Sequence, residues 1–254
     1  MKIFSIATNT FKEVIRDRIF YSLVFFAALI LGASVLISTL TIGEQTKIIE
    51  DLSLGAINIF GVIISIFVGI GLVSKEIEKK TIYTIISKPI RRYEFLLGKY
   101  LGLAMTLLIY ISLMTVCFMT VLYLYIGAAR WNLLLAVLFI YFELLVVTAV
   151  AMLFSTFSTP TLSATYTLAV YVIGHLIADL KGLAEKAPSE LAKGLLNVLY
   201  YVLPNLGNFN IKGEVVHNVP ISFERVAATV AYGVLYVFVL LLTASAVFQR
   251  RNFK

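Results

Sequence analysis

The sequence predicts an all-α membrane protein that crosses the bilayer six times, and three observations support this class. Hydrophobic residues make up 60% of the 254-residue chain and charged residues only 14%, whereas soluble domains are about half apolar and about a quarter charged. The apolar residues gather in runs of about 20, the helix length that crosses roughly 30 Å of hydrocarbon. The basic residues lie beside the ends of these runs, as the positive-inside rule describes.

The N-terminal segment, residues 1–18, is predicted to form an amphipathic helix before the first apolar run. Its apolar side chains recur at helical spacing, and its cations fall on the other faces. A helix of this kind lies in the membrane interface. It either anchors and orients the first span or acts as an elbow that passes motion into the bundle. The apolar positions are Ile3, Phe4, Ala7, Phe11, Val14 and Ile15.

Six apolar runs follow, and each is expected to form one helix of a single transmembrane domain, residues 1–254. Six crossings place both termini on one side of the membrane. Fourteen of the 21 basic residues lie on that side: four in the N-terminal segment, seven in the loop 75–99 and three at the C-terminus. Both termini are therefore expected in the cytoplasm, in a multi-pass protein of the cell (cytoplasmic or inner) membrane. The expected spans are Ile19–Leu40, Leu54–Val73, Leu101–Ile126, Leu133–Phe154, Leu162–Ala178 and Val226–Phe248.

The loop 75–99 joins the second and third spans and is predicted to contain two short helices with a break at Pro89. Proline disfavours helix at the residue before it and fits the first turn of a new helix. Ile90 follows directly, beside the cations Arg91 and Arg92. The residues alone allow two interpretations. The corner is a docking surface whose arginines pair with acids of a soluble partner, or the loop is solvated and only sets topology.

The segment Ile85–Gly102 reads IISKPIRRYEFLLGKYLG and resembles the pattern LLSxPIxRxxxLLGKxLG of ABC type-2 export permeases. The family has an acidic stretch before this pattern, as here, and a glycine where this chain has Lys80. The layout is also similar, with an interfacial N-terminal helix, six spans and a longer external loop before the last span. The chain looks closest to the branch of copper-processing and gliding-type permeases.

The resemblance implies the membrane-spanning subunit of an ABC exporter. It implies a second permease copy, as a homodimer or with a related permease, because six spans are half the usual twelve. It also implies that the segment between the second and third spans contacts a separate ABC ATPase subunit, which binds Mg-ATP. The residues carried over to this coupling role are Glu76, Glu78, Lys88, Pro89, Ile90, Arg91 and Arg92.

The chain is not expected to be an enzyme or to bind a cofactor itself. A phosphate-binding loop needs the pattern GxxxxGK followed by Ser or Thr. The pair Gly98–Lys99 has Tyr93 where the first glycine should stand and Tyr100 in place of Ser or Thr. Nucleic acid is not an expected partner either, because the net charge of +7 is explained by the topology and the lipid bilayer.

The external loop 179–225 is long, and its middle is rich in leucine and aromatic residues. An amphipathic helix is expected there, and Pro204 and Gly207 are expected to end the apolar run. About ten apolar residues are too few to cross the membrane. We therefore expect a re-entrant or interfacial hairpin, and the alternative is a small external cap packed on the bundle.

Glu143 is the clearest polar residue inside a span, in the middle of the fourth. A charge facing lipid at that depth costs about 3 kcal/mol, so Glu143 is expected to face the bundle or to be protonated. A substrate or coupling role and a structural hydrogen bond both fit. His175 and Asp179 could form a metal pair, but one pair makes no site. Met114, Cys117 and Met119 allow a Cu(I) hypothesis because soft ligands suit that ion, but no metal site is predicted.

Two other functional classes remain open from the sequence. A membrane anchor or assembly subunit would recruit a soluble partner without transporting anything. A secondary transporter would normally show internal repeats and helices broken near the midplane, and neither feature is visible in the sequence. The transported substrate cannot be read from these residues.

Overall fold

The computed structural model describes residues 2–40, 43–78, 91–128, 130–177, 181–182 and 189–250, with the backbone alone for 72–78 and 250. Every regular element in these ranges is helical. The helices are α1 (Lys2–Ile15), α2 (Arg18–Ser38), α3 (Gln45–Glu78), α5 (Arg92–Ile126), α6 (Leu133–Ser155), α7 (Pro160–His175), α9 (Glu190–Val202), the 3-10 helix η1 (Leu206–Phe209), α10 (Lys212–Val216) and α11 (Phe223–Arg250).

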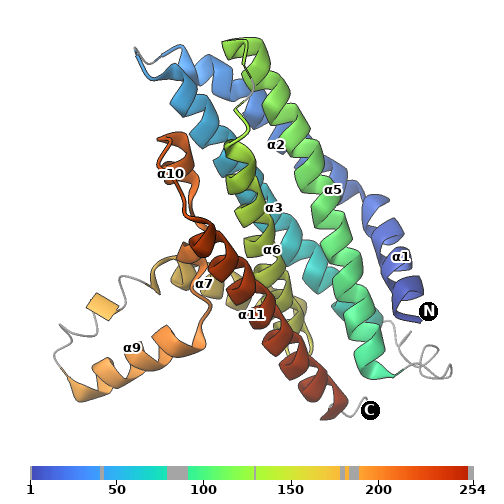
Figure 1. The fold of residues 1–254 in the computed structure, drawn as a ribbon. Coiled ribbons are helices and arrows are strands. Elements are labelled where there is room, and N and C mark those ends of the chain that lie inside the picture. The colour runs from blue at the N-terminus through green and yellow to red at the C-terminus, as the bar shows by residue number, and fades with distance from the viewer. Residues whose placement is uncertain are drawn as a thin grey trace.

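The long helices form one bundle around α6 (Figure 1). Helix α6 contacts α3, α5, α7 and α11, and 67% of its most apolar stretch is buried. The same measure is 22% for α2 and 17% for α11. Most of the apolar surface of α2 and α11 therefore faces outward, where hydrocarbon or another protein would have to cover it.

Five helices are long and apolar enough to cross a membrane: α2, the Gln45–Gly71 part of α3, α5, α6 and the Phe223–Gln249 part of α11. They correspond to the first, second, third, fourth and sixth expected spans. The fifth expected span is α7, which has only 16 residues. At 1.5 Å per residue it is about 24 Å long, which is shorter than the hydrocarbon core.

Local sequence signals fix several helix ends. Asp17 separates α1 from α2 and accepts a hydrogen bond from the Ile19 amide at 2.9 Å, which caps α2. Gly127 ends α5 in the left-handed conformation at a φ of 76°, which glycine adopts without a steric penalty. Pro160 occupies the first turn of α7. Proline lacks an N–H, and an N–H in the first turn of a helix has no intrahelical partner in any case.

The segment before α11 divides into two parts. Helix α9 projects away from the bundle (Figure 1), and none of its residues is buried against the described part of the chain. From η1 to α10 the chain packs on α3, α6 and α7. The second part is therefore packed on the bundle, whereas α9 is not. The buried apolar residues there are Leu206, Phe209, Ile211, Val215 and Val216.

Candidate functional site

The residues expected to contact an ATPase fall at the junction between α3 and α5. Lys88, Pro89 and Ile90 lie outside the described residues. Glu76 and Glu78 belong to the last turns of α3, of which the backbone alone is described. Arg91 is exposed and directly precedes α5. Its backbone N–H donates a 2.8 Å hydrogen bond to Glu94 Oε2, which stabilises the start of that helix.

Arg92, in contrast, is engaged within the chain. Its Nη1 atom donates to the carbonyl oxygens of Phe248 at 2.9 Å and Gln249 at 3.0 Å, at the end of α11. The last carbonyls of a helix lack intrahelical partners and carry partial negative charge, so a guanidinium there is favourable. The rings of Phe95 and Phe248 stack beside this contact, with their centroids 6.3 Å apart. The start of α5 is therefore attached to the end of α11.

Helix α1 packs closely on α5 through two glycines. A Cβ atom at Gly98 would lie 2.7 Å from the Cβ of Ile6, and one at Gly102 would lie 2.7 Å from the Ala7 carbonyl oxygen. The absence of side chains at Gly98 and Gly102 is what allows the two backbones to approach. The expected apolar positions Ala7 and Val14 are buried here, whereas Phe4 is exposed.

A buried lysine lies in the same contact region. The side chain of Lys99 is 2% exposed, and its Nζ atom lies 3.6 Å from Glu13 Oε2 on α1. The same Nζ lies 5.7 Å from the centre of the Phe95 ring, within the range of a cation–π interaction. Helices α1, α5 and α11 are thus joined by specific contacts close to the point where the loop 75–99 enters α5.

A second candidate site is a polar cluster inside the bundle, around Glu143 of α6. The carboxylate is fully buried. Asn58 of α3 donates its Nδ2–H to Glu143 Oε2 at 2.8 Å, and its Oδ1 accepts from the Tyr171 hydroxyl of α7 at 3.0 Å. His175 Nε2, also on α7, lies 3.3 Å from Glu143 Oε1. The acid therefore faces protein and connects three helices.

The sequence did not reveal the partners of Glu143. It grouped His175 with Asp179, which lies outside the described residues, whereas the nearby acid is on another helix. No group of three or more His, Cys, Asp and Glu side chains that could hold a metal occurs within the described ranges. Met114 is fully buried in the apolar core. The signal available in the sequence was the presence of Asn58, Glu143 and His175 inside three different apolar runs.

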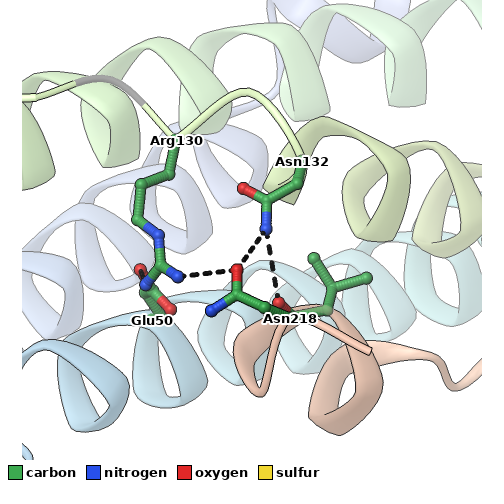
Figure 2. Close-up of polar contacts among 5 residues, drawn as sticks. Glu50, Arg130, Asn132 and Asn218 are labelled. Atoms are coloured by element: carbon green, nitrogen blue, oxygen red, sulfur yellow. Dashed lines mark hydrogen bonds and ion pairs between the residues drawn. The ribbon is translucent and has the colours of Figure 1, made fainter. Parts of the chain in front are cut away.

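A third polar group, here called the Arg130 clasp, consists of Glu50, Arg130, Asn132 and Asn218 (Figure 2). Arg130 binds Glu50 Oε1 at 2.5 Å and donates to Asn218 Oδ1 at 2.8 Å. Asn132 donates to the same Oδ1 at 3.0 Å. The clasp ties α3 to the α5–α6 connection and the α10–α11 connection. Asn218 has a positive φ of 56°, a conformation that asparagine tolerates better than most residues.

Comparison with known proteins identifies the family. Residues 4–253 match the family described as ABC-2 family transporter protein. No curated protein matches the chain significantly. The family match covers nearly the whole chain and agrees with the apolar helices of the bundle. The chain belongs to the ABC-2 family of transporter proteins and is a type-2 ABC permease of the membrane.

Proposed function

We propose that this chain is the membrane-spanning subunit of an ABC exporter and works as a dimer with a separate ATPase. ATP and Mg²⁺ bind the ATPase, and the loop 75–99 receives its motion. The observation that carries the proposal is the set of contacts at the start of α5. A displacement of this loop would reach α11 through Arg92 and α1 through Gly98 and Gly102.

The contacts support different roles for Arg91 and Arg92. Arg91 is exposed and free to meet an acidic residue at the rim of an ATPase groove, where ion pairs tune specificity more than affinity. Arg92 holds α11. Ile90 fills an apolar pocket of the ATPase. Because ATP binding changes the ATPase surface, it favours one of two arrangements of the permease helices over the other.

We further propose that α7 is part of the fifth of six crossings, so that both termini are cytoplasmic. Helix α7 packs back along α6 after a short turn, and η1 contacts both of them. A Cβ atom at Gly174 would lie 2.8 Å from the Pro204 carbonyl oxygen, so the returning chain is placed directly on the end of α7. The segment 204–216 then extends the short helix along α6.

The dimer proposal is supported by the outward apolar surfaces of α2 and α11, each largely unburied in the single chain. A two-fold pair places the same surface of both subunits in contact and can enclose a path between them. Transport is directed outward, as the similarity to export permeases implies.

The coupling proposal is tested with the double variant Ile90→Asp/Arg91→Asp and the ATPase that co-purifies with the tagged chain. Membrane insertion and thermal stability are expected to be unchanged, because Arg91 is exposed. ATPase recruitment should weaken, or ATP hydrolysis should no longer drive transport. The control Lys12→Asp reverses an exposed charge on α1, outside the loop, and should leave recruitment intact. Normal ATPase binding and transport by the double variant would reduce the loop to a topology signal.

The same preparation separates the other functional classes. Co-purification of an ATPase whose hydrolysis is required for transport excludes a secondary transporter. ATP-dependent transport in reconstituted vesicles excludes a membrane anchor that only recruits a partner. If an ATPase binds and no transport occurs with any exported compound class, the anchor function replaces the exporter.

A further inference from the structure

The two oxygens of the Glu143 carboxyl group have different surroundings. Oε2 accepts a hydrogen bond from Asn58. Oε1 accepts none from the described residues and has His175 Nε2 as its neighbour at 3.3 Å. A buried carboxylate without a compensating charge or hydrogen bond is strongly destabilising. Of the described side chains, His175 is the one placed to give a proton to Oε1 directly.

The backbone of α7 fixes one proton of His175. The ring Nδ1 lies 3.0 Å from the Tyr171 carbonyl oxygen. A carbonyl oxygen can only accept, so Nδ1 must carry the hydrogen of this bond. If His175 were neutral with its hydrogen on Nδ1, the Nε2 lone pair would face Oε1. An ionised Glu143 would then oppose a second lone pair, which is repulsive. A proton between Nε2 and Oε1 removes the repulsion.

We propose that Glu143 and His175 form a proton-binding site inside the bundle, in which one exchangeable proton lies between Oε1 and Nε2 and fastens α7 to α6. The pair is an imidazolium with a carboxylate, or a neutral imidazole with a carboxylic acid. Both forms have no net charge and contain the same proton. This site stands on side-chain geometry and does not rest on the proposed export function.

The groups around the pair come from several helices. Tyr171 shares α7 with His175, and α3 contributes Asn58. Lys212 of α10 interacts electrostatically with both Glu143 and His175. Tyr110 of α5 donates to the Ile57 carbonyl, next to Asn58. Among the described residues that face the pair, Lys212 is therefore a second group that can hold a cationic proton.

The His175 side chain is 23% exposed at the surface of the single chain, while Glu143 is fully buried. Separation of α7 from α6 would leave Glu143 without its neighbour. Any movement between these helices is therefore coupled to proton uptake or release at the pair. Asn58 of α3 bonds to both Glu143 and Tyr171. Binding or release of the one proton therefore affects the contacts among α3, α6 and α7.

The test uses the full-length chain in lipid nanodiscs with nitrogen-15 in its histidines, followed by NMR between pH 5 and 9. The chain has only two histidines, and His217 is exposed, so it serves as an internal reference. His217→Gln assigns the remaining signals to His175 without changing the pair. Infrared spectroscopy of the same samples, with and without Glu143→Gln, detects a protonated carboxylic acid.

Two results support the proposal. Either His175 is doubly protonated at pH 8, or His175 is neutral with its hydrogen on Nδ1 and an acid band is present that disappears in Glu143→Gln. Parallel titration of His175 and His217, or a neutral His175 without an acid band at pH 7, overturns it. The results that overturn the proposal are read in the unsubstituted pair, so they do not depend on whether Glu143→Gln folds. That variant serves only to assign the acid band to Glu143.

Stability gives an independent measurement. The unfolded chain loses its histidine proton above about pH 6.5, while the folded pair keeps one. Stability should therefore fall with rising pH in that range, up to tenfold in the unfolding constant per pH unit. Between about pH 4.3 and 6.5 both states hold one proton, so the pair contributes no slope. The double variant Glu143→Gln/His175→Gln removes both titratable groups and should have no such slope above about pH 6.5, and an unchanged slope counts against the proposal.

Discussion

The close contact between α1 and α5 leads to a quantitative prediction for Gly102→Ala. The added Cβ would lie 2.6 Å from the Thr10 Cβ and 2.7 Å from the Ala7 carbonyl oxygen. Neither atom can move by a side-chain rotation, because the Ala7 carbonyl belongs to the backbone of α1 and the Thr10 Cβ is bonded directly to it. The whole helix must shift, and Ala7, Thr10 and Val14 lose part of their burial.

The magnitude follows from two opposing effects. Overpacking of a tight contact costs about 1–3 kcal/mol, and the obstruction by backbone places Gly102→Ala near the upper end. Alanine favours the helix over glycine by about 1 kcal/mol. The net loss of stability is about 2 kcal/mol, which corresponds to a fall of about 4–8 °C in the unfolding temperature.

The matched control is Gly32→Ala in α2, where the added Cβ meets nothing within 4 Å. Only the helix propensity acts there, so this variant should be about 0.5–1 kcal/mol more stable than the parent. Thermal unfolding of both purified full-length variants in the same detergent gives opposite shifts. Equal unfolding temperatures for the two variants would refute the packing of α1 on α5.

Three further predictions concern the polar contacts and the topology. Arg92→Gln should lower stability by about 0.5–2 kcal/mol, because the last carbonyls of α11 lose a charged donor, while Arg91→Gln should be nearly neutral in the same thermal unfolding assay. Arg130→Met should cost about 3–5 kcal/mol, because Glu50 keeps a buried charge without its partner; adding Glu50→Gln should recover most of the loss in denaturation measurements. Lys88→Cys should react with a membrane-impermeant thiol reagent only from the cytoplasmic side.

A specific result would contradict each of these three predictions. Equal effects of the two arginine substitutions would mean that Arg92 does not hold α11. A double variant at positions 50 and 130 that is no more stable than Arg130→Met alone would mean that the ion pair is not the cause of the loss. Reaction of Lys88→Cys from outside only would reverse the topology and remove the coupling proposal with it.

The sequence predicted the class and the positions of most helices because hydrophobicity is a local property. The runs that begin at Ile19, Leu101 and Leu133 correspond to α2, α5 and α6. Hydropathy marks only the apolar part of a helix, so α3 and α5 begin earlier than their runs, at Gln45 and Arg92. Polar residues continue these helices because the backbone hydrogen bonds are satisfied within the helix in any solvent.

The fifth run shows where this reasoning is insufficient. Leu162–Ala178 has the composition of a span, but α7 ends at His175. The chain that returns from Pro204 packs on its end at Gly174 and continues along α6. Composition cannot show that two segments separated by α9 lie end to end. The six crossings therefore remain a proposal supported by packing.

The amino-acid sequence by itself determined that the chain is a helical membrane protein, and its segment 85–102 indicated the type-2 ABC permeases. Hydrocarbon thickness and charge asymmetry act on each segment separately, so one sequence is sufficient for them. Only the tertiary structure decided that Arg92 meets Phe248 and that Glu143 meets His175. These contacts depend on which helix faces are packed together, and no local pattern records that pairing.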